Sequence, residues 1–527
     1  MIRGDKTTLP MTERTPPIAA ERLSRSVFTL SIAGALVFLY LRTFLLPAVP
    51  FVAHDDQILF FIRGARVAHG QILYRDFFEL VPPGIDSLYG ATFRLFGIHA
   101  WIMQAWCIAL GLALFSVVTL IARRILRGPL VLLPGLLFLI FDFNSALDPT
   151  HHWFSTLAAL MAVGVLMGGA SLRRIFASSS FCAIATLFTQ TQGALTFVAL
   201  FLYLLWLKRS EAQGPGLRPQ LATLVLPFTL ILSCVVGYYV HKAGFRTIFF
   251  DLVLFPLKFL SSGNFNSPHA YLDQLLPLHA PGGVVRLIPV VFIYAVVPYI
   301  YAVGAYQLWR KREILPARLR QHLVLLHLVG VALFLAVASG PRFHRLCTVA
   351  PPAILVCAWL LSQPGPALRL ARNLSCLLAI AFAFLLPFYR QTQWHATLDF
   401  PIGTTAFSDP LEFREYQWLA ERSHPSELLF NHGGLDLYLS LENPTASEFV
   451  TDTDFTRPEQ VAAVLESLQR RPPRFIVLEP ENTNPSDVHD HSAPFRQYVY
   501  DNYHLIQVFP LNHNSRYEEL WERLPPR

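Results

Sequence analysis

A series of long apolar blocks between residues 26 and 388 is the feature that most constrains this fold. Because the hydrocarbon core of a bilayer is about 30 Å thick, a helix needs roughly 20 apolar residues to cross it. The chain is therefore expected to cross a membrane many times. Length and flanking charge predict about eleven spans, with approximate limits 26–48, 101–121, 130–141, 153–170, 175–189, 193–207, 221–240, 285–309, 323–339, 346–361 and 373–388.

The distribution of charge supports the same conclusion. Charged residues make up 15% of the 527 residues, against roughly 25% in an ordinary soluble protein. The deficit lies in the apolar blocks, whereas the segment from Arg390 onward has an ordinary polar composition. These features exclude a disordered chain, a fibrous protein and a purely soluble enzyme. They predict an α-helical polytopic membrane protein with a small C-terminal α/β domain.

The basic residues set the expected topology. The net charge of +7 does not indicate a nucleic-acid partner, because Lys and Arg lie in short clusters between apolar blocks. With the N-terminus in the cytoplasm, these clusters fall in inside loops, and an odd number of spans places the C-terminal domain outside. We expect a multi-pass protein of the bacterial inner membrane. The inside clusters are Arg123, Arg124 and Arg127; Arg173 and Arg174; Lys208, Arg209 and Arg218; Arg310, Lys311, Arg312, Arg318 and Arg320; and Arg369 and Arg372.

The chain divides into three predicted parts: a cytoplasmic tail over 1–25, a transmembrane domain over 26–389 and an extracytoplasmic α/β domain over 390–527. Two outer loops, 49–100 and 241–284, are unusually long, and loops beyond about 12–15 residues are usually functional or disordered. All six cysteines lie in apolar blocks without CxxC spacing, so no disulfide or zinc framework is expected. The C-terminal domain is predicted to contain helices at Phe413–Arg422 and Pro458–Arg470 and strands at Glu427–Phe430 and Arg474–Leu478.

The first outer loop holds the most informative segment, from His54 to Gly84. It begins with two adjacent carboxylates, Asp55 and Asp56, continues into a predicted amphipathic helix up to Ala68, and then breaks at a glycine. The pair alone is equally well explained as a solvated helix terminus. The later part of the segment contains Gly70, Tyr74, Asp76, Phe77, Pro82 and Pro83.

This order resembles the first external loop of the polytopic GT-C glycosyltransferases, particularly the protein O-mannosyltransferases and lipid A aminoarabinose transferases. That family usually has Asp-Glu, then Gly-x-x-Tyr-x-Asp-Phe, then Pro-Pro. Here Asp55-Asp56 stands in place of Asp-Glu, so the resemblance does not decide which carboxylate is catalytic. The plan of the whole chain is also similar, with many helices, a long first outer loop and an outer C-terminal domain.

The resemblance implies transfer of a sugar from a polyprenyl-phosphate carrier to an acceptor hydroxyl, with inversion. Asp55 or Asp56 would be the general base that takes the acceptor proton. Tyr74 and Asp76 are candidates for substrate positioning, and Asp76 is equally suited to capping a turn. Mg²⁺ or Mn²⁺ is a possible cofactor that the sequence does not decide.

The departing phosphate calls for cations on the outer side. Arg342, His344 and Arg345 lie in a short outside loop, where basic residues break the topology rule. They are candidates for lipid-phosphate binding, with Lys258 as a weaker one. The alternative is that they meet anionic headgroups.

A further outside cluster, Asp148 with His151 and His152, is a candidate for substrate positioning or for ordinary capping. The expected partners are the lipid-linked sugar donor, a glycan, lipid or protein acceptor of the envelope, and membrane lipids. The competing functions are a transporter or flippase of lipid-linked glycans and a non-catalytic envelope assembly protein.

Overall fold

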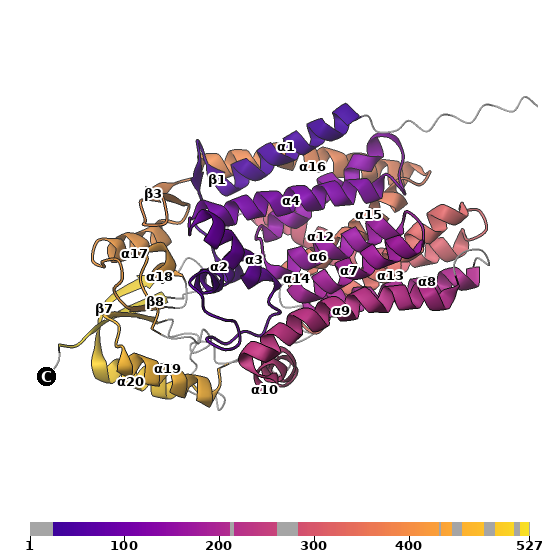
Figure 1. Cartoon of the computed structure of the whole chain (residues 1–527). Coiled ribbons are helices and arrows are strands. Elements are labelled where there is room, and N and C mark those ends of the chain that lie inside the picture. The colour runs from indigo at the N-terminus through magenta and orange to yellow at the C-terminus, as the bar shows by residue number, and fades with distance from the viewer. Residues whose placement is uncertain are drawn as a thin grey trace, which may run out of the picture.

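The computed structural model describes residues 25–210, 216–260, 283–431, 434–444, 456–478, 491–510 and 517–525. Residues 1–24 of the predicted tail and 261–282 of the second long loop lie outside the described residues, as does the side chain of Asp55. Figure 1 shows a long bundle of helices with the C-terminal domain at one end.

Each of the eleven predicted spans overlaps a helix or a run of helices. The first was predicted too long, because residues 44–48 form a strand and a turn after α1. The single helices are α1 (Arg25–Thr43), α4 (Trp101–Ala122), α6 (His151–Leu166), α7 (Leu172–Phe188), α8 (Gln190–Ser210), α9 (Leu217–Ala243), α12 (Gly283–Arg310), α13 (Ala317–Val337) and α16 (Pro366–Thr392).

Two spans are irregular. The third is a run of short helical segments, η1 (Gly128–Leu132), α5 (Leu133–Leu137), the π-helical η2 (Phe138–Asp142) and η3 (Phe143–Ala146). The tenth is a pair of helices, α14 (Phe343–Val349) and α15 (Pro351–Leu361), that meet at a bend of 66°. Eight spans in the described part of the chain are long and apolar enough to cross a bilayer, or nine with the bent pair. The remaining two, α6 and α7, have 16 and 17 residues.

The first long loop forms structure of its own between the bundle and the C-terminal domain. A short hairpin of β1 (Phe44–Leu45) and β2 (Val49–Pro50) leads into α2 (Asp55–Ala68), and α3 (Gly84–Phe96) follows after a turn-rich segment. Helices α2 and α3 lie against each other through two glycines. A Cβ at Gly64 would overlap Tyr89 on α3, and a Cβ at Gly90 would overlap Val67 on α2. Small residues at these positions therefore set how closely α2 approaches the bundle.

The described part of the second long loop is helical. It consists of α10 (Phe245–Phe249) and the π-helical segments η4 (Phe250–Leu254) and η5 (Pro256–Leu260). The first loop packs on the end of α9 and on this element through a small apolar cluster of its own, formed by Leu73, Tyr74, Phe77, Tyr239 and Ile248. The two long loops therefore support each other.

The C-terminal domain is a small α/β unit. It contains a hairpin of β3 (Ala396–Leu398) and β4 (Thr405–Phe407) and a four-stranded sheet in the order β5-β6-β8-β7. Strand β5 pairs parallel with β6, and the other pairs are antiparallel. The bounds are α17 (Pro410–Ala420), β5 (Leu429–Phe430), α18 (Leu435–Tyr438), α19 (Pro458–Arg470), β6 (Phe475–Leu478), α20 (Ala493–Asn502), β7 (Tyr503–Pro510) and β8 (Tyr517–Arg523).

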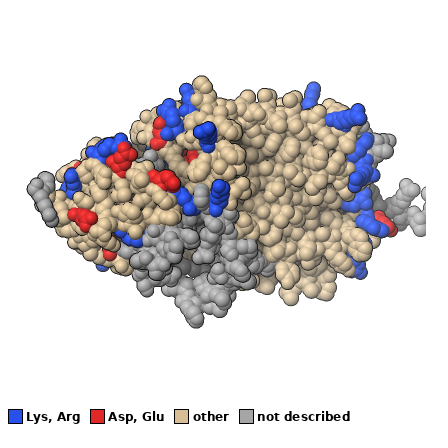
Figure 2. Space-filling model, turned by 90° about the horizontal axis from the view of Figure 1, so that it is seen from below, with Lys and Arg blue, Asp and Glu red and all other residues tan. Residues whose placement is uncertain are grey.

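Charge on the surface follows this division. On the face that Figure 2 shows, the described Lys and Arg of the bundle gather at the end away from the C-terminal domain. Acidic and basic residues mix on and beside the C-terminal domain, and a wide uncharged band lies between the two charged regions. This is the pattern of a protein that crosses a bilayer with its helices along the membrane normal.

Candidate functional site

The C-terminal domain fixes the segment that leads into α2. The backbone N–H of Val52 donates to the Ala406 carbonyl at 3.0 Å, and the N–H of Ala53 donates to the Tyr438 hydroxyl at 2.9 Å. The Nδ1 atom of His54 lies 3.3 Å from a carboxylate oxygen of Glu412. Helix α2 therefore begins at a position set by residues that follow it by more than 300 positions in the chain.

One face of α2 presents three side chains toward the bundle. Asp56, Phe60 and Arg63 are spaced i, i+4 and i+7, which places them on one side of a helix. Asp56 is exposed in the first turn, where a carboxylate is favoured by the helix dipole. The Arg63 guanidinium lies 5.4 Å from the centroid of the Phe60 ring.

Arg63 forms a buried ion pair with Glu79 from the turn that precedes α3. The two charged groups are 2.6 Å apart, and their side chains are 4% and 0% exposed. The other carboxylate oxygen of Glu79 accepts the N–H of Val81 at 2.7 Å. A buried pair of this kind costs desolvation but is strongly destabilising when one partner is removed. It locks the Phe77–Val81 turn onto α2.

The basic loop after α13 comes next to the acidic end of α2. Asp56 and Arg342 both act electrostatically on the guanidinium of Arg345 in α14, so that guanidinium lies within reach of both charges. Arg345 also donates to the Gly340 carbonyl at 3.3 Å. The structure thus places Asp56 within electrostatic range of Arg345, one of the predicted phosphate-binding residues, and a second one, Arg342, acts on the same guanidinium.

The start of α6 reaches the same place. The His151 ring packs edge-on against Phe60 at 5.0 Å between centroids and lies 4.0 Å from the His152 ring. Arg345 acts electrostatically on both imidazoles, with Arg63 acting on His151 and His344 on His152. The Nδ1 atoms of both histidines are buried and have no hydrogen-bond partner among the described residues.

Two more carboxylates lie near α14. Asp148 and Asp142 both act electrostatically on the thiol of Cys347. Asp148 is only partly buried, whereas Asp142 in the π-helical η2 is fully buried. The preceding loop is tied to α3 by the Tyr89 hydroxyl, which donates to the Pro149 carbonyl at 3.0 Å.

The motif residues Tyr74 and Asp76 have structural contacts. Tyr74 adopts a φ of +65°, is buried, and donates its hydroxyl to the Val81 carbonyl at 2.8 Å. Asp76 accepts the N–H of Ile72 at 2.7 Å and pairs with Arg75 at 2.8 Å. This bonding with Arg75 lowers the pKa of the Asp76 carboxyl. Its described contacts are those of a turn cap, the alternative that the sequence left open.

Lys258, the weakest predicted cation, is exposed on η5 of the second long loop. On the neighbouring η4, Asp251 is 3% exposed. Burial and the charge of Glu79 raise the pKa of Asp251 to about 7. The second loop therefore approaches the Arg63–Glu79 pair with a carboxyl group that titrates near neutrality.

Sequence reasoning missed Arg63, Glu79 and Asp142. Arg63 reads as a routine polar position on an amphipathic helix, and Glu79 stands inside the Asp-Phe-Phe-Glu stretch without a spacing signal of its own. A signal existed for Asp142, because an ionisable residue at the end of an apolar block is costly in a bilayer and is usually functional.

The assembled group has the composition of an anion-binding site with a base beside it. Arg342 and Arg345 offer planar guanidinium donors that suit phosphate oxygens, and Asp56 offers an acceptor for a proton. No set of three or more His, Cys, Asp or Glu side chains within the described residues is arranged to hold a metal ion.

No protein-family model matches this chain, and no curated protein matches its sequence. In structure the chain is similar to ArnT from Cupriavidus metallidurans in the apo state. The TM-score is 0.58 at 15% identity, and the likeness covers 95% of this chain and 99% of that one. The chain therefore has the GT-C fold, from the first span to the C-terminal domain.

Two larger proteins show weaker likeness. They are the oligosaccharyltransferase AglB from Archaeoglobus fulgidus, in complex with an inhibitory peptide and a dolichol-phosphate, and the arabinofuranosyltransferase AftD from Mycobacteria. Both have TM-scores of 0.48, with 11% and 13% identity. The likeness covers 92% of this chain and 73% of AglB, and 96% of this chain and 40% of AftD. Scores at this level add nothing to the fold assignment.

Proposed function

We propose that this multi-pass membrane protein is a glycosyltransferase that moves a sugar from a polyprenyl-phosphate carrier to an acceptor hydroxyl on the outer face of the bacterial inner membrane. The observation that carries the proposal is that Asp56 acts electrostatically on Arg345, from a segment almost 290 residues away in the chain, and that Arg342 acts on the same guanidinium. The full-length likeness to ArnT supports it at the level of the fold.

The reaction would be a single displacement. Asp56 takes the proton of the acceptor hydroxyl as the acceptor oxygen forms a bond to the anomeric carbon of the sugar. The bond between that carbon and the carrier phosphate breaks, and its electron pair leaves with the phosphate oxygen. Arg345 and Arg342 stabilise the resulting anion, and the anomeric configuration inverts.

His151 and His152 are proposed to position the donor sugar. Their buried Nδ1 atoms have no partner among the described residues, so a sugar hydroxyl can bond to them without displacing a protein contact. Arg63 and Glu79 are positioning residues, since they hold the face of α2 and the turn before α3 in register. Tyr74, Asp76, Asp148 and Lys258 remain proposed substrate-binding residues, and a divalent ion remains a proposed cofactor.

The test is transfer by the purified full-length protein in vesicles, with polyprenyl-phosphate sugars extracted from the source cells as donors and release of polyprenyl phosphate as the readout. Asp56→Asn should lower the rate by about 100- to 10,000-fold, the usual contribution of a general base. Asp55→Asn is the matched control, one position away on the same helix turn.

The possible results of these assays lead to different conclusions about the acidic pair and about transfer itself. Loss with Asp55→Asn and activity with Asp56→Asn would move the base to Asp55. Unchanged transfer in the double variant, with normal yield and gel-filtration profile, would remove the acidic pair from catalysis. Absence of transfer by the unaltered protein with every donor extracted would overturn the proposal.

A second candidate function is translocation of a lipid-linked glycan. The 66° bend between α14 and α15 and the buried Asp142 in a π-helical break are features that transporters use near the middle of the membrane. Movement of a fluorescent polyprenyl-linked sugar between leaflets, lost in Asp142→Asn but retained in Asp56→Asn, would favour translocation over transfer.

A further inference from the structure

A cavity of about 610 Å³ lies at the opposite end of the bundle from the C-terminal domain. It is half-open and is lined by the turn between α6 and α7, the last turns of α8 and the first turns of α9 and α13. Its size falls in the range of sites that hold a small ligand. The positive-inside distribution predicts that this end faces the cytoplasm, so the cavity is separated from the Asp56 site by the length of the helices.

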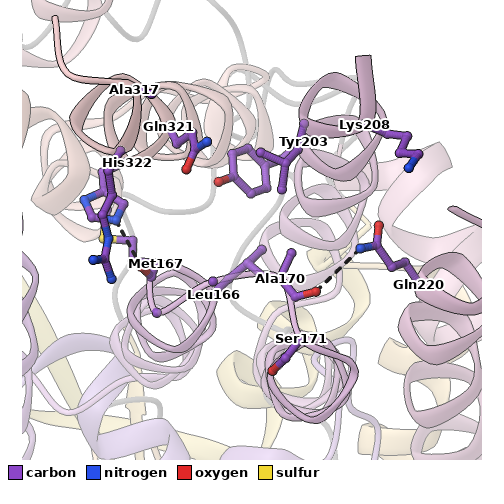
Figure 3. A pocket seen from close by; sticks show the side chains of 14 residues that line it. Leu166, Met167, Ala170, Ser171, Tyr203, Lys208, Gln220, Ala317, Gln321 and His322 are labelled. Atoms are coloured by element: carbon purple, nitrogen blue, oxygen red, sulfur yellow. Dashed lines mark hydrogen bonds between the residues drawn. The ribbon is translucent and has the colours of Figure 1, made fainter. Parts of the chain in front are cut away.

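The polar lining of the cavity is cationic and hydrogen-bonding. Lys208 and Arg318 line it, and none of the described lining residues is acidic. Figure 3 shows the Tyr203 ring pointing toward Gln321 on one side of the cavity, with Lys208 and Gln220 on another side. These groups suit an anion that also accepts hydrogen bonds.

The walls are well fixed. The two ring nitrogens of His322 lie 3.3 Å from the Arg124 carbonyl and 3.0 Å from the Met167 carbonyl. Gln220 donates to the Ala170 carbonyl at 3.5 Å (Figure 3). Gly169, at φ +120°, allows the chain to turn from α6 to α7, and Arg174 donates to the Gly168 carbonyl. The cavity is therefore bounded by held groups on several helices.

Further cationic side chains lie around the cavity, beyond those that line it. Burial and the charges of Arg318 and Arg174 lower the pKa of Arg124. In addition, α7, α9 and α13 all direct their N-termini here, and the first turn of each contains arginine and no acidic residue. Arginine is disfavoured at a helix N-terminus, where the dipole is already positive. Helix N-termini and guanidinium groups both favour a bound anion, above all a phosphate.

We infer that this cavity binds the phosphate of an anionic phospholipid headgroup, through Lys208, Arg318 and the N-terminus of α7. The site goes beyond the proposed transfer reaction and does not depend on it. Its place at the ends of several spans puts it at headgroup depth, where basic pockets between helices recognise anionic lipids.

The test counts lipids on the full-length protein. The protein is placed in phosphatidylcholine nanodiscs with rising amounts of phosphatidylglycerol, and native mass spectrometry follows the tightest-bound phosphatidylglycerol. Lys208→Gln or Arg318→Gln should each raise its apparent Kd about fivefold, and the double variant roughly 30-fold. Arg209→Gln, next to Lys208 but outside the cavity lining, should change it by less than about twofold.

A further variant, Ser171→Asp, tests whether weaker binding results from a change in the cavity or from a loss of folding. Ser171→Asp keeps a favoured N-cap residue on α7 and places a carboxylate at the cavity wall. It should weaken phosphatidylglycerol binding at least as much as Lys208→Gln while leaving the thermal unfolding midpoint intact. Equal binding in Ser171→Asp, the double variant and Arg209→Gln would overturn the site.

Competition with inorganic phosphate distinguishes a lipid headgroup from a soluble phosphate compound as the ligand of this cavity. If millimolar phosphate leaves the bound phosphatidylglycerol in place, the headgroup assignment stands. If phosphate displaces it, and binds the unaltered protein but not the double variant in detergent without lipid, the site serves a soluble phosphate compound and the headgroup assignment fails.

Discussion

The two ends of the helical bundle handle positive charge in opposite ways. At the end near the C-terminal domain, Arg63 forms a buried ion pair with Glu79, and Arg345 lies within electrostatic range of Asp56 as well as of Arg342. At the far end, Arg174 and Arg318 act electrostatically on Arg124, beside a cavity with no acidic residue among its described lining. The first end thus balances its cations with groups of the chain itself. The described cavity lining at the second end contains no carboxylate.

The largest expected effect on stability comes from removing one partner of the buried Arg63–Glu79 ion pair. Arg63→Met should destabilise the protein by about 3–5 kcal/mol, because the carboxylate of Glu79, at 0% exposure, loses the cation of its ion pair. Thermal unfolding in detergent measures the change. Arg63→Met with Glu79→Met should recover most of the loss.

The matched variant at the far end is Arg124→Met. Its guanidinium is affected by other cations, so the free energy of unfolding of Arg124→Met should stay within about 0.5 kcal/mol of that of the unaltered protein. A large loss there, or none in Arg63→Met, would mean that the two ends do not differ as described.

A second prediction concerns Arg345 and the proposed transfer reaction. Arg345→Gln should lower the transfer rate by about 100-fold, the usual effect of removing a group that stabilises developing charge. Arg345→Lys should recover only part of the rate, because a lysine cannot form the paired bonds of a guanidinium.

Arg312→Gln provides the control for that experiment. Arg312 is exposed beside Glu313 in the turn between α12 and α13. Its substitution should keep the transfer rate within about twofold of that of the unaltered protein. A similar loss in both variants would indicate a general effect of net charge and would contradict a local role of Arg345.

A third prediction concerns the contact that holds the start of α2. Tyr438→Phe removes the hydroxyl that accepts the Ala53 N–H at 2.9 Å. Because the buried N–H then lacks this acceptor, the free energy of unfolding should fall by about 1–3 kcal/mol. Thermal unfolding should register the loss. Tyr416→Phe removes the hydroxyl of the neighbouring ring, which packs edge-on against Tyr438 at 5.7 Å between centroids, and should have the smaller effect.

The smallest expected effect is a pH dependence at Asp251. Its folded-state pKa of about 7 lies above the usual carboxyl value of 3.8, so the unfolded chain loses the proton more readily. The favourable contribution of the neutral group is complete below pH 3.8 and is lost as the pH rises to about 7.

The thermal unfolding midpoint of the unaltered protein should fall between pH 4 and 7. In Asp251→Asn this decrease should be smaller by about 1–3 °C. Parallel pH profiles would contradict the burial of Asp251 against Glu79. Asp399→Asn, a carboxyl in an exposed turn of the C-terminal domain, is the control.

Much of the fold could be predicted from the sequence, because hydrophobic length is a local property. The predicted helix Pro458–Arg470 agrees with α19 in both limits, and the predicted spans fall on helices of the bundle. The third span was harder to delimit, since a chain of 3₁₀, α and π turns has no single hydrophobic period.

The candidate site was only partly predictable. Asp56, His151 and Arg345 stood out because each is a polar residue where topology does not require one. Their meeting depends on how α2, α6 and α14 pack, and no local pattern contains that information. The same holds for the Arg63–Glu79 pair and for the far cavity, whose wall residues come from four separate turns.

The hydrogen bond between Ala53 and Tyr438 joins residues 385 positions apart. A chain made from its N-terminus onward inserts its spans long before Tyr438 leaves the ribosome. The start of α2, and with it the acidic pair, must therefore wait for the last quarter of the polypeptide before it can take its final position. The order of synthesis makes the C-terminal domain the last component to arrive, so an incomplete chain can occupy the membrane without presenting a finished site.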